Sequence, residues 1–365
     1  MTNPQIWLSQ IRVGSFLNPL PFLGAEASHK TSSRSDCSGQ AAKHPLCVTG
    51  WFYYIAGSAG KYKPPAIIFL WVLTSMTAQA YIVPMNRLST ERRAAVVAAL
   101  VEGNSIRATV RMTGAALHTV LKLLNDLGCA CAAYHNRSVR NLRVRRIQAD
   151  EIWNFVGAKA KNVSVEKKAE GWGDVWTWVA IDADSKLCVS YLVGGRDAGW
   201  AMDFMEDCAN RVIGRVQITT DGHRAYLDAV EGAFGMDVDY AQLQKIYGAP
   251  SDDEQRRYSP AKCIGCDMKV VSGDPDPKHI STSFVERQNL TMRMSMRRFT
   301  RLTNAFSKKV DNLRHAVALH YMYYNFCRVH QSLRVTPAME AGLSDHVWSL
   351  AELVSLMDSG RVIAA

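Results

Sequence analysis

The sequence predicts an α/β protein in which a mixed sheet flanked by helices follows an all-α N-terminal part. Runs of strand-forming residues, such as Val216–Thr220, are interspersed with longer runs of helical periodicity. Residues 89–127, which come before them, hold several helix-capping and helix-ending residues. We therefore expect a helical domain first and the sheet after it.

Residues 86–130 are predicted to form a helix-turn-helix domain. Ser89 and Ser105 are suited to cap helices, and Gly114 to make the turn between the second and third. An ordinary three-helix bundle is the alternative. The expected helices begin at Ser89, run from Ser105 to Thr113, and run from Ala115 to Leu127, where Gly128 ends the third. Side chains able to reach phosphates and base edges favour DNA binding, with the third helix as reader: Arg107, Arg111, His118, Thr119 and Lys122.

Residues 131–146 are expected to form a basic linker. They contain several arginines and no acid, so they suit either a solvated connection or a contact with the phosphate backbone. A second basic set follows residue 286, with interleaved methionines that we expect to pack in the core. The arginines that we single out for DNA are Arg137, Arg140, Arg143, Arg293, Arg297 and Arg298.

Residues 147–345 are expected to form the sheet domain, with a polar insertion at about 251–279 and a C-terminal helix and tail at 346–365. Asp182-Ala183-Asp184-Ser185 has the composition of a hairpin turn. The expected strands are 144–153, 174–181, 186–193 and 215–220, and the expected helices are 198–212, 224–234, one opening at 283, and 311–330. We also expect Thr336, followed by Pro337, to cap a short terminal helix.

Three acids stand in contexts suited to holding divalent metal. We expect Asp150 and Asp221 at strand ends and Glu286 near the start of a helix. Two Mg²⁺ or Mn²⁺ ions about 3.5–4 Å apart need shared carboxylate oxygens, as in phosphoryl transfer. Glu151 and Asp182 are alternatives for the first position.

The chain from about Asn86 to Val347 resembles DDE transposases of bacterial insertion sequences, most closely the insertion-sequence-one type. The resemblance rests on three segments, which are Thr219-Thr220-Asp221-Gly222-His223-Arg224-Ala225-Tyr226, Val285-Glu286-Arg287-Gln288-Asn289 and Tyr323-Tyr324-Asn325-Phe326-Cys327-Arg328-Val329-His330. It implies a ribonuclease-H-like catalytic domain whose metal-binding acids are Asp150, Asp221 and Glu286, with Arg293 as the basic residue beyond the glutamate.

The resemblance also implies a function. Such an enzyme binds the ends of its mobile element, cleaves them and joins the 3′-hydroxyl ends to target DNA, in the bacterial cytoplasm and as a homo-oligomer. His223 and His330 are secondary candidates for phosphate contact or for supporting the ligands. The alternatives are an inactive remnant that binds DNA through its helix-turn-helix, and a metal-dependent nuclease without strand transfer.

Composition agrees with a nucleic-acid partner. The formal net charge is +10 and the pI about 9.2, which favours a polyanion. The nine cysteines show no evenly spaced disulfide framework, so we expect a reducing compartment. Cys263 and Cys266, with His279 downstream, are weak candidates for a zinc site.

Residues 1–84 differ from the rest in composition and periodicity. The resemblance begins at about Met85, so we expect residues 1–84 to be an extension from upstream translation. Ala66 to Val83 is partly apolar, but its polar residues make a membrane span the less favoured interpretation.

Overall fold

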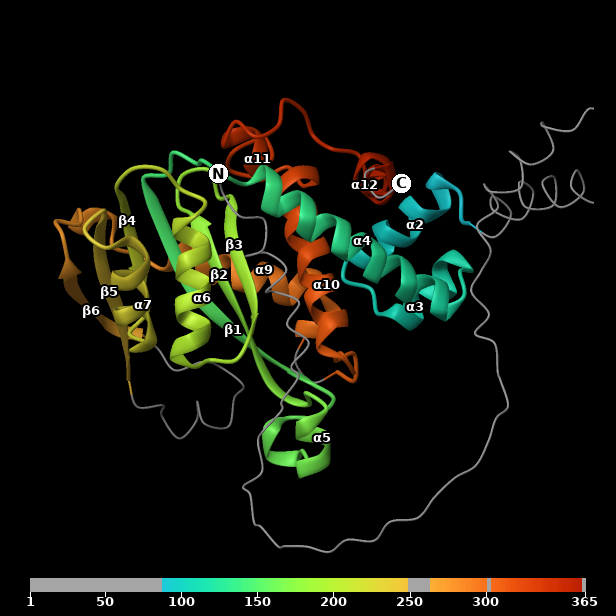
Figure 1. The fold of residues 1–365 in the computed structure, drawn as a ribbon, viewed down its shortest axis with the longest axis horizontal. Coiled ribbons are helices and arrows are strands. Elements are labelled where there is room, and N and C mark those ends of the chain that lie inside the picture. The colour runs from blue at the N-terminus through green and yellow to red at the C-terminus, as the bar shows by residue number, and fades with distance from the viewer. Residues whose placement is uncertain (1–86, 249–262, 301–302, 363–365) are drawn as a thin grey trace, which may run out of the picture. The chain divides into compact units, whose positions relative to one another are not determined.

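The sheet holds six strands in the part of the chain that the computed structural model describes, which comprises residues 87–248, 263–300 and 303–362 (Figure 1). Their spatial order is β3-β2-β1-β4-β5-β6. The predicted α/β class with a mixed, helix-flanked sheet is therefore confirmed. The strands are β1 (Arg146–Val156), β2 (Gly173–Asp182), β3 (Cys188–Gly194), β4 (Val216–Thr220), β5 (Val238–Tyr247) and β6 (Cys263–Ser272).

The pairing directions fix where the acids lie. β1, β2 and β3 are antiparallel neighbours, whereas β4 runs parallel to both β1 and β5. Ala149 of β1 is level with Thr220, the last residue of β4. Asp150 and Asp221 therefore follow at the same level. The expectation that both stand at strand ends is wrong for Asp150, because β1 continues to Val156 while pairing with β2.

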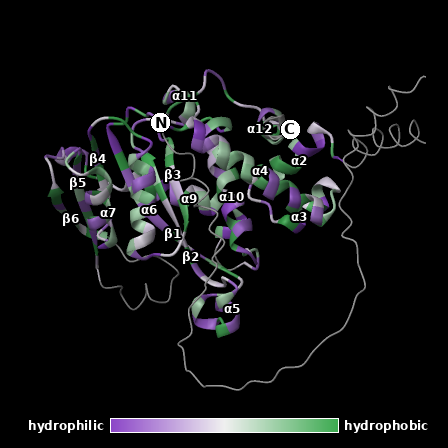
Figure 2. Ribbon diagram, viewed as in Figure 1, coloured by the Kyte–Doolittle hydropathy of each residue, from purple (hydrophilic) through white to green (hydrophobic). Residues whose placement is uncertain are grey.

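Helices cover both faces of the sheet (Figure 1). On one face, the buried Trp178 ring of β2 meets Phe204 of α6 (Ala198–Ala209) and Tyr226 of α7 (Ala225–Phe234), with ring centroids 5.8 and 5.4 Å apart. On the other face, Gln148 of β1 accepts hydrogen bonds from the first turn of α9 (Ser283–Ser295). Figure 2 shows mixed hydrophilic and hydrophobic residues on these helices, as expected for elements with one buried side.

The first two N-terminal helices begin directly after their predicted serine caps, whereas the third begins at Leu117, without a side-chain cap, and not at the expected Ala115. They are α2 (Thr90–Val101), α3 (Ile106–Thr113) and α4 (Leu117–Ser138). The Ser89 and Ser105 hydroxyls accept hydrogen bonds from the backbone N–H groups of Arg92 and Ala108, at 3.3 and 3.1 Å. Gly114 adopts the left-handed conformation with φ of 67°, as the turn requires.

The predicted end of the third helix is wrong, because α4 continues to Ser138 and takes in the first part of the expected linker. Gly128 does not end the helix but allows another helix to pack closely against it. A Cβ added to it would stand 2.4 to 2.7 Å from atoms of His315 in α10 (Val310–Met322). Glycine thus allows two helix backbones to approach, and that tertiary contact outweighs its low helix propensity.

The C-terminal helices complete the same compact unit, which spans residues 88–365. Arg93 of α2 forms an ion pair with Asp358 at 3.3 Å, linking the first and last described helices. The predicted helix at 311–330 divides into α10 and a π-helical turn, Tyr323–Cys327. Thr336 caps α11 (Pro337–Glu340) as predicted, and α12 (Leu350–Val362) is the last helix.

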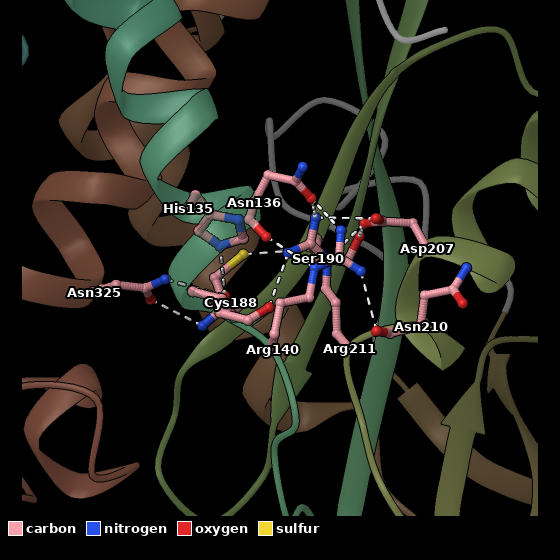
Figure 3. A network of polar contacts seen from close by, with 10 residues as sticks. His135, Asn136, Arg140, Cys188, Ser190, Asp207, Asn210, Arg211 and Asn325 are labelled. Carbon is pink, nitrogen blue, oxygen red and sulfur yellow. Dashed lines mark hydrogen bonds and ion pairs between the residues drawn. The ribbon is translucent and has the colours of Figure 1, made fainter. Parts of the chain in front are cut away.

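A buried polar network joins α4, β3, α6 and the π-helical turn (Figure 3). The Arg211 guanidinium donates to both carboxylate oxygens of Asp207, at 2.8 and 3.0 Å, and to the Val139 carbonyl at 3.0 Å. Asn325 brackets Cys188 by donating to its carbonyl and accepting from its N–H, at 3.0 and 2.9 Å. Each charge in this network meets an opposite charge or a dipole, so the network is balanced.

The largest error of the sequence prediction lies between residues 238 and 272. β5 was not foreseen, and the second part of the expected insertion is the edge strand β6, antiparallel to β5. The first part, and the extension at 1–84 with its apolar stretch, lie outside the described residues. Within the described part, no helix combines the length and apolar content needed to cross a membrane.

Candidate functional site

Asp150, Asp221 and Glu286 line one pocket of about 490 Å³. β1 supplies Asp150, the end of β4 supplies Asp221, and α9 supplies Glu286. The pocket is also lined by Arg196, Gly222, His223, Leu243, Gln244, Lys245, Tyr247 and Thr282. The structure therefore brings together three acids that are widely separated in the sequence.

Gln148 fixes α9 against β1. Its side-chain carbonyl accepts from the N–H groups of Phe284 and Val285, at 2.8 and 3.2 Å, and so meets donors that the first turn of a helix leaves free. Asp150 lies two residues further along β1, on the same face. Asn289, one turn beyond Glu286, donates its amide to Asp150 at 2.9 Å. This pairing aligns α9 with the acid of β1.

The tightest acidic cluster consists of Asp150, Glu151 and Asp221. One carboxylate oxygen from each lies within 4.8 Å of the other two. The sequence suggested Glu151 only as an alternative to Asp150, yet both carboxylates belong to the cluster. The sequence signal for Glu151 was its position next to Asp150. Because β4 ends beside these two residues, Asp221 can approach both of them.

Glu151 is held by residues that the sequence analysis missed. Arg196, which follows β3, forms an ion pair with it at 2.6 Å, and the Tyr226 hydroxyl donates to it at 3.1 Å. Its side chain is only 4% exposed. Burial raises the pKa of Glu151, as does Asp221, whereas Arg196 opposes the shift.

Glu286 is turned toward a different partner. Its carboxylate accepts from the Thr282 hydroxyl at 2.7 Å and pairs with the ammonium of Lys245 on β5. It thus lines the pocket without joining the tight cluster. Lys245 was absent from the predicted site because β5 was not recognised as a strand.

The pocket carries excess negative charge around Asp150. Burial, together with the neighbouring Glu151 and Asp221, raises the pKa of Asp150 to about 7, so the ionised form is unfavourable there. The Asn289 carbonyl oxygen is buried and has no hydrogen-bond partner among the described residues. The three crowded carboxylates of Asp150, Glu151 and Asp221 form a donor set that fits a hard divalent cation.

Asp182 does not belong to this pocket. It lies level with Ile147, three residues before Asp150 on β1. Its carboxylate accepts from the N–H groups of Asp184 and Ser185, both at 3.1 Å, and from the Ser185 hydroxyl. It is therefore the capping acid of the hairpin turn, and the structure does not place it in the pocket as an alternative to Asp150.

The two histidines differ in position. His223 lines the pocket, and its backbone N–H donates to Asp221 at 3.0 Å while its ring accepts from the Ala225 N–H at 3.0 Å. His330 is absent from the pocket lining; its ring contacts the Ser332 hydroxyl at 3.0 Å. Burial lowers the pKa of His330, with Lys186 and Arg328 adding to the effect.

The arginines proposed for DNA contact fall into two groups. Arg137, which stands over the Tyr134 ring, is exposed, as are Arg107, Arg111, Arg143 and Arg297. Arg140 instead donates to the Asn136 and Asn210 carbonyls, at 2.8 and 3.0 Å, within the network of Figure 3.

Arg298 and Arg293 are half-buried. Burial lowers the pKa of Arg298 to about 10, and its guanidinium donates to Ser307. Arg293 is not among the residues that line the acidic pocket. On α4, His118, Thr119 and Lys122 are exposed, and Lys122 pairs with Asp126 at 2.8 Å.

The remaining candidates are placed as follows. Met292 and Met296 are buried as expected. Met294 is 72% exposed, so the prediction that it packs in the core is wrong. Cys263 and Cys266 are exposed on β6, and His279 contacts Arg146. Among the described residues, the three-acid cluster is the group whose spacing suits a metal.

Comparison of the chain with protein-family models and with curated proteins gives no match.

Proposed function

We propose that this protein is a DDE-type transposase that cleaves the ends of a DNA element and joins their 3′-hydroxyl ends to target DNA. The observation that carries the proposal is the convergence of Asp150, Asp221 and Glu286 on one pocket. The strand order β3-β2-β1-β4-β5 around that pocket supports a ribonuclease-H-like catalytic domain. The same acids were selected from the sequence by their motifs.

Asp150, Glu151 and Asp221 would hold Mg²⁺ or Mn²⁺, with Glu286 as a further ligand once released from Lys245. Such ions, when bound, polarise the phosphoryl oxygens and activate the attacking hydroxyl. The chain's own residues supply the rest. Asn289 orients Asp150, Arg196 orients Glu151, and Lys245 offers a cation to a phosphate in the pocket.

The exposed polar residues of α3 and α4 support a role in binding the element's ends. Arg107 and Arg111 are exposed on α3, and His118 and Thr119 are exposed in the first turn of α4. This end of α4 is suited to present side chains to a DNA groove, and the basic residues to contact phosphates. The net charge of +10 supports the same kind of partner.

The test separates end binding from chemistry. Asp150→Asn, Asp221→Asn and Glu286→Gln keep side-chain shape nearly constant while removing the charge that attracts a cation. Each variant should lose joining of pre-cut ends in Mg²⁺ and still bind ends in a gel-shift assay. Asp182→Asn is the matched control and should remain active. If folded Asp221→Asn joins ends at the wild-type rate, the proposal is wrong.

The same assay distinguishes two rival functions. A nuclease would cut the ends in Mg²⁺ without joining the liberated 3′-hydroxyl to a second DNA. A protein that only binds DNA would shift the ends and do neither. Joined products that disappear in Asp221→Asn are the outcome that supports transposition.

A further inference from the structure

β1 and β2 extend beyond the end of β4 into a structured arm, formed by residues 157–172 with the short helix α5 (Val165–Ala169) (Figure 1). Gly157 has φ of 72°, and a Cβ there would stand 2.1 Å from the Trp172 ring, so the ring packs directly on the backbone. The Gly157 N–H donates to the Ser307 carbonyl at 2.8 Å. These contacts hold the arm at its base.

An aromatic row leads from the acidic pocket to this arm. Trp153 and Phe155 alternate with Glu151 along β1, so all three lie on the same face of the strand. Trp176 is opposite Trp153 on β2, with ring centroids 6.4 Å apart, and the Phe306 ring packs at a tilt against Phe155, with centroids 5.1 Å apart. All four rings are half-buried, whereas Trp178 on the same face is covered by α6 and α7.

Cations accompany the row along its length. The Arg196 guanidinium lies 5.6 Å from the centroid of the Trp176 ring, and the Lys159 ammonium 5.5 Å from that of Trp153. Arg196 also lines the acidic pocket, so it connects the two regions. Lys308 and Lys309 are exposed immediately after Ser307, at the base of the arm. Residues 157–174 add Lys161, Lys167 and Lys168, against three acids.

Partly exposed rings flanked by cations are suited to unpaired nucleotides. A base offers its flat face only when it has left the double helix, and stacking on tryptophan tolerates any sequence. Phosphates of the same strand would meet Lys159 and Arg196. In a duplex, neighbouring bases cover those faces, and the rings would contribute little.

We propose that the aromatic row at the base of the arm binds a single strand of DNA as it leaves the acidic pocket. The inference rests on the proposed function, since it names the strand that this pocket would process. The partner of the row is then single-stranded DNA, and Arg196 lies where the row meets the acidic pocket. The row would hold unpaired nucleotides next to the reacting phosphate.

The experiment measures binding of a labelled oligo-dT strand to the full-length protein by fluorescence anisotropy, in EDTA so that no metal is needed. Trp153→Leu removes the stacking surface and should weaken binding roughly tenfold. Trp153→Phe keeps a ring and should retain most of the affinity. Lys159→Gln with Lys161→Gln alters exposed side chains only, so folding is preserved, and it should reduce the salt dependence of binding.

Lys269→Gln is the matched control, because Lys269 is exposed on β6 at the far edge of the sheet. It should bind oligo-dT as the wild type does. Wild-type binding by both Trp153→Leu and the double lysine variant would overturn the inference. So would an equal loss of affinity for duplex and single strand. Because this assay contains no metal, its result is independent of the joining assay that tests the proposed function.

Discussion

Two polar regions of this protein contrast in how their charges are matched. Around Arg211, the guanidinium, the Asp207 carboxylate and nearby carbonyls satisfy one another in the interior. Around Asp150, three carboxylates crowd together, and burial raises the pKa of that acid to about 7. The first region stabilises the fold, whereas the second retains an imbalance that a bound cation would relieve. Charge imbalance, more than the presence of buried charge, therefore points to function.

The largest effect expected of a single substitution is a break in the balanced region. Arg211→Leu leaves the Asp207 carboxylate buried without its partner and should lower the free energy of unfolding by about 3–5 kcal/mol. Urea denaturation followed by circular dichroism measures the change. Lys122→Gln, which removes an exposed ion pair with Asp126, is the control and should cost less than about 1 kcal/mol. Equal losses of stability in the two variants would show that the buried network contributes no more than an exposed ion pair.

Acid should weaken the interior through two buried histidines. Burial lowers the pKa of His135 and of His320 to about 3, from 6.5 in the unfolded chain; Arg211 and Arg328 respectively add to the shifts. Below pH 6.5 the unfolded state takes up protons that the folded state refuses. Stability should thus fall between pH 6.5 and 3, by up to ~1.4 kcal/mol per pH unit for each histidine.

The measurement is the urea midpoint at near-neutral pH and at mildly acidic pH. His320→Gln removes one titrating group and should flatten the pH dependence by about half of the histidine contribution. His118→Gln, at an exposed position on α4, serves as the control. An unaltered slope in His320→Gln would contradict the assignment.

A smaller effect is expected where α4 meets α10. Gly128→Ala forces α10 away from α4, which supplies part of the balanced region, and should cost about 1–3 kcal/mol. Gly232→Ala, in α7 with open space around the added carbon, should instead gain about 0.5–1 kcal/mol. Thermal unfolding of the two variants gives the comparison. A stabilising Gly128→Ala would mean that the helices are not in close contact.

In the acidic pocket, by contrast, removing a charge is expected to increase stability. In EDTA, Asp150→Asn removes one of three crowded charges and should raise stability by about 1 kcal/mol. Asp182→Asn should lower it by a similar amount, because its carboxylate accepts three hydrogen bonds from its own turn. Thermal unfolding of the two variants measures both changes in stability. Destabilisation by Asp150→Asn as large as that by Asp182→Asn would show that the pocket is balanced without a cation.

The sequence was most informative where local chemistry decides structure. Helix caps at Ser89, Ser105 and Thr336 were found from residue type, because each hydroxyl satisfies N–H groups of its own helix. Asp221 and Glu286 were found from motifs that surround them closely in the chain. These features need no knowledge of distant partners.

The features that were missed depend on distant partners. Gly128 does not end α4, because His315 packs against it from α10. β5 carries half of its length in an exposed, mixed-polarity pattern, which weakens the alternation by which strands are recognised. Consequently Lys245 was missed, and with it the partner of Glu286. Arg196 was missed because only the folded sheet brings it to Glu151.

The most direct test of the central claim is Mn²⁺ binding by the full-length protein, followed through the electron paramagnetic resonance signal of the free ion. The wild type should take up Mn²⁺, Asp221→Asn should bind it at least about tenfold more weakly, and Asp182→Asn should match the wild type. Wild-type Mn²⁺ affinity in folded Asp221→Asn would contradict the account, because the crowded carboxylates would then not be a cation site.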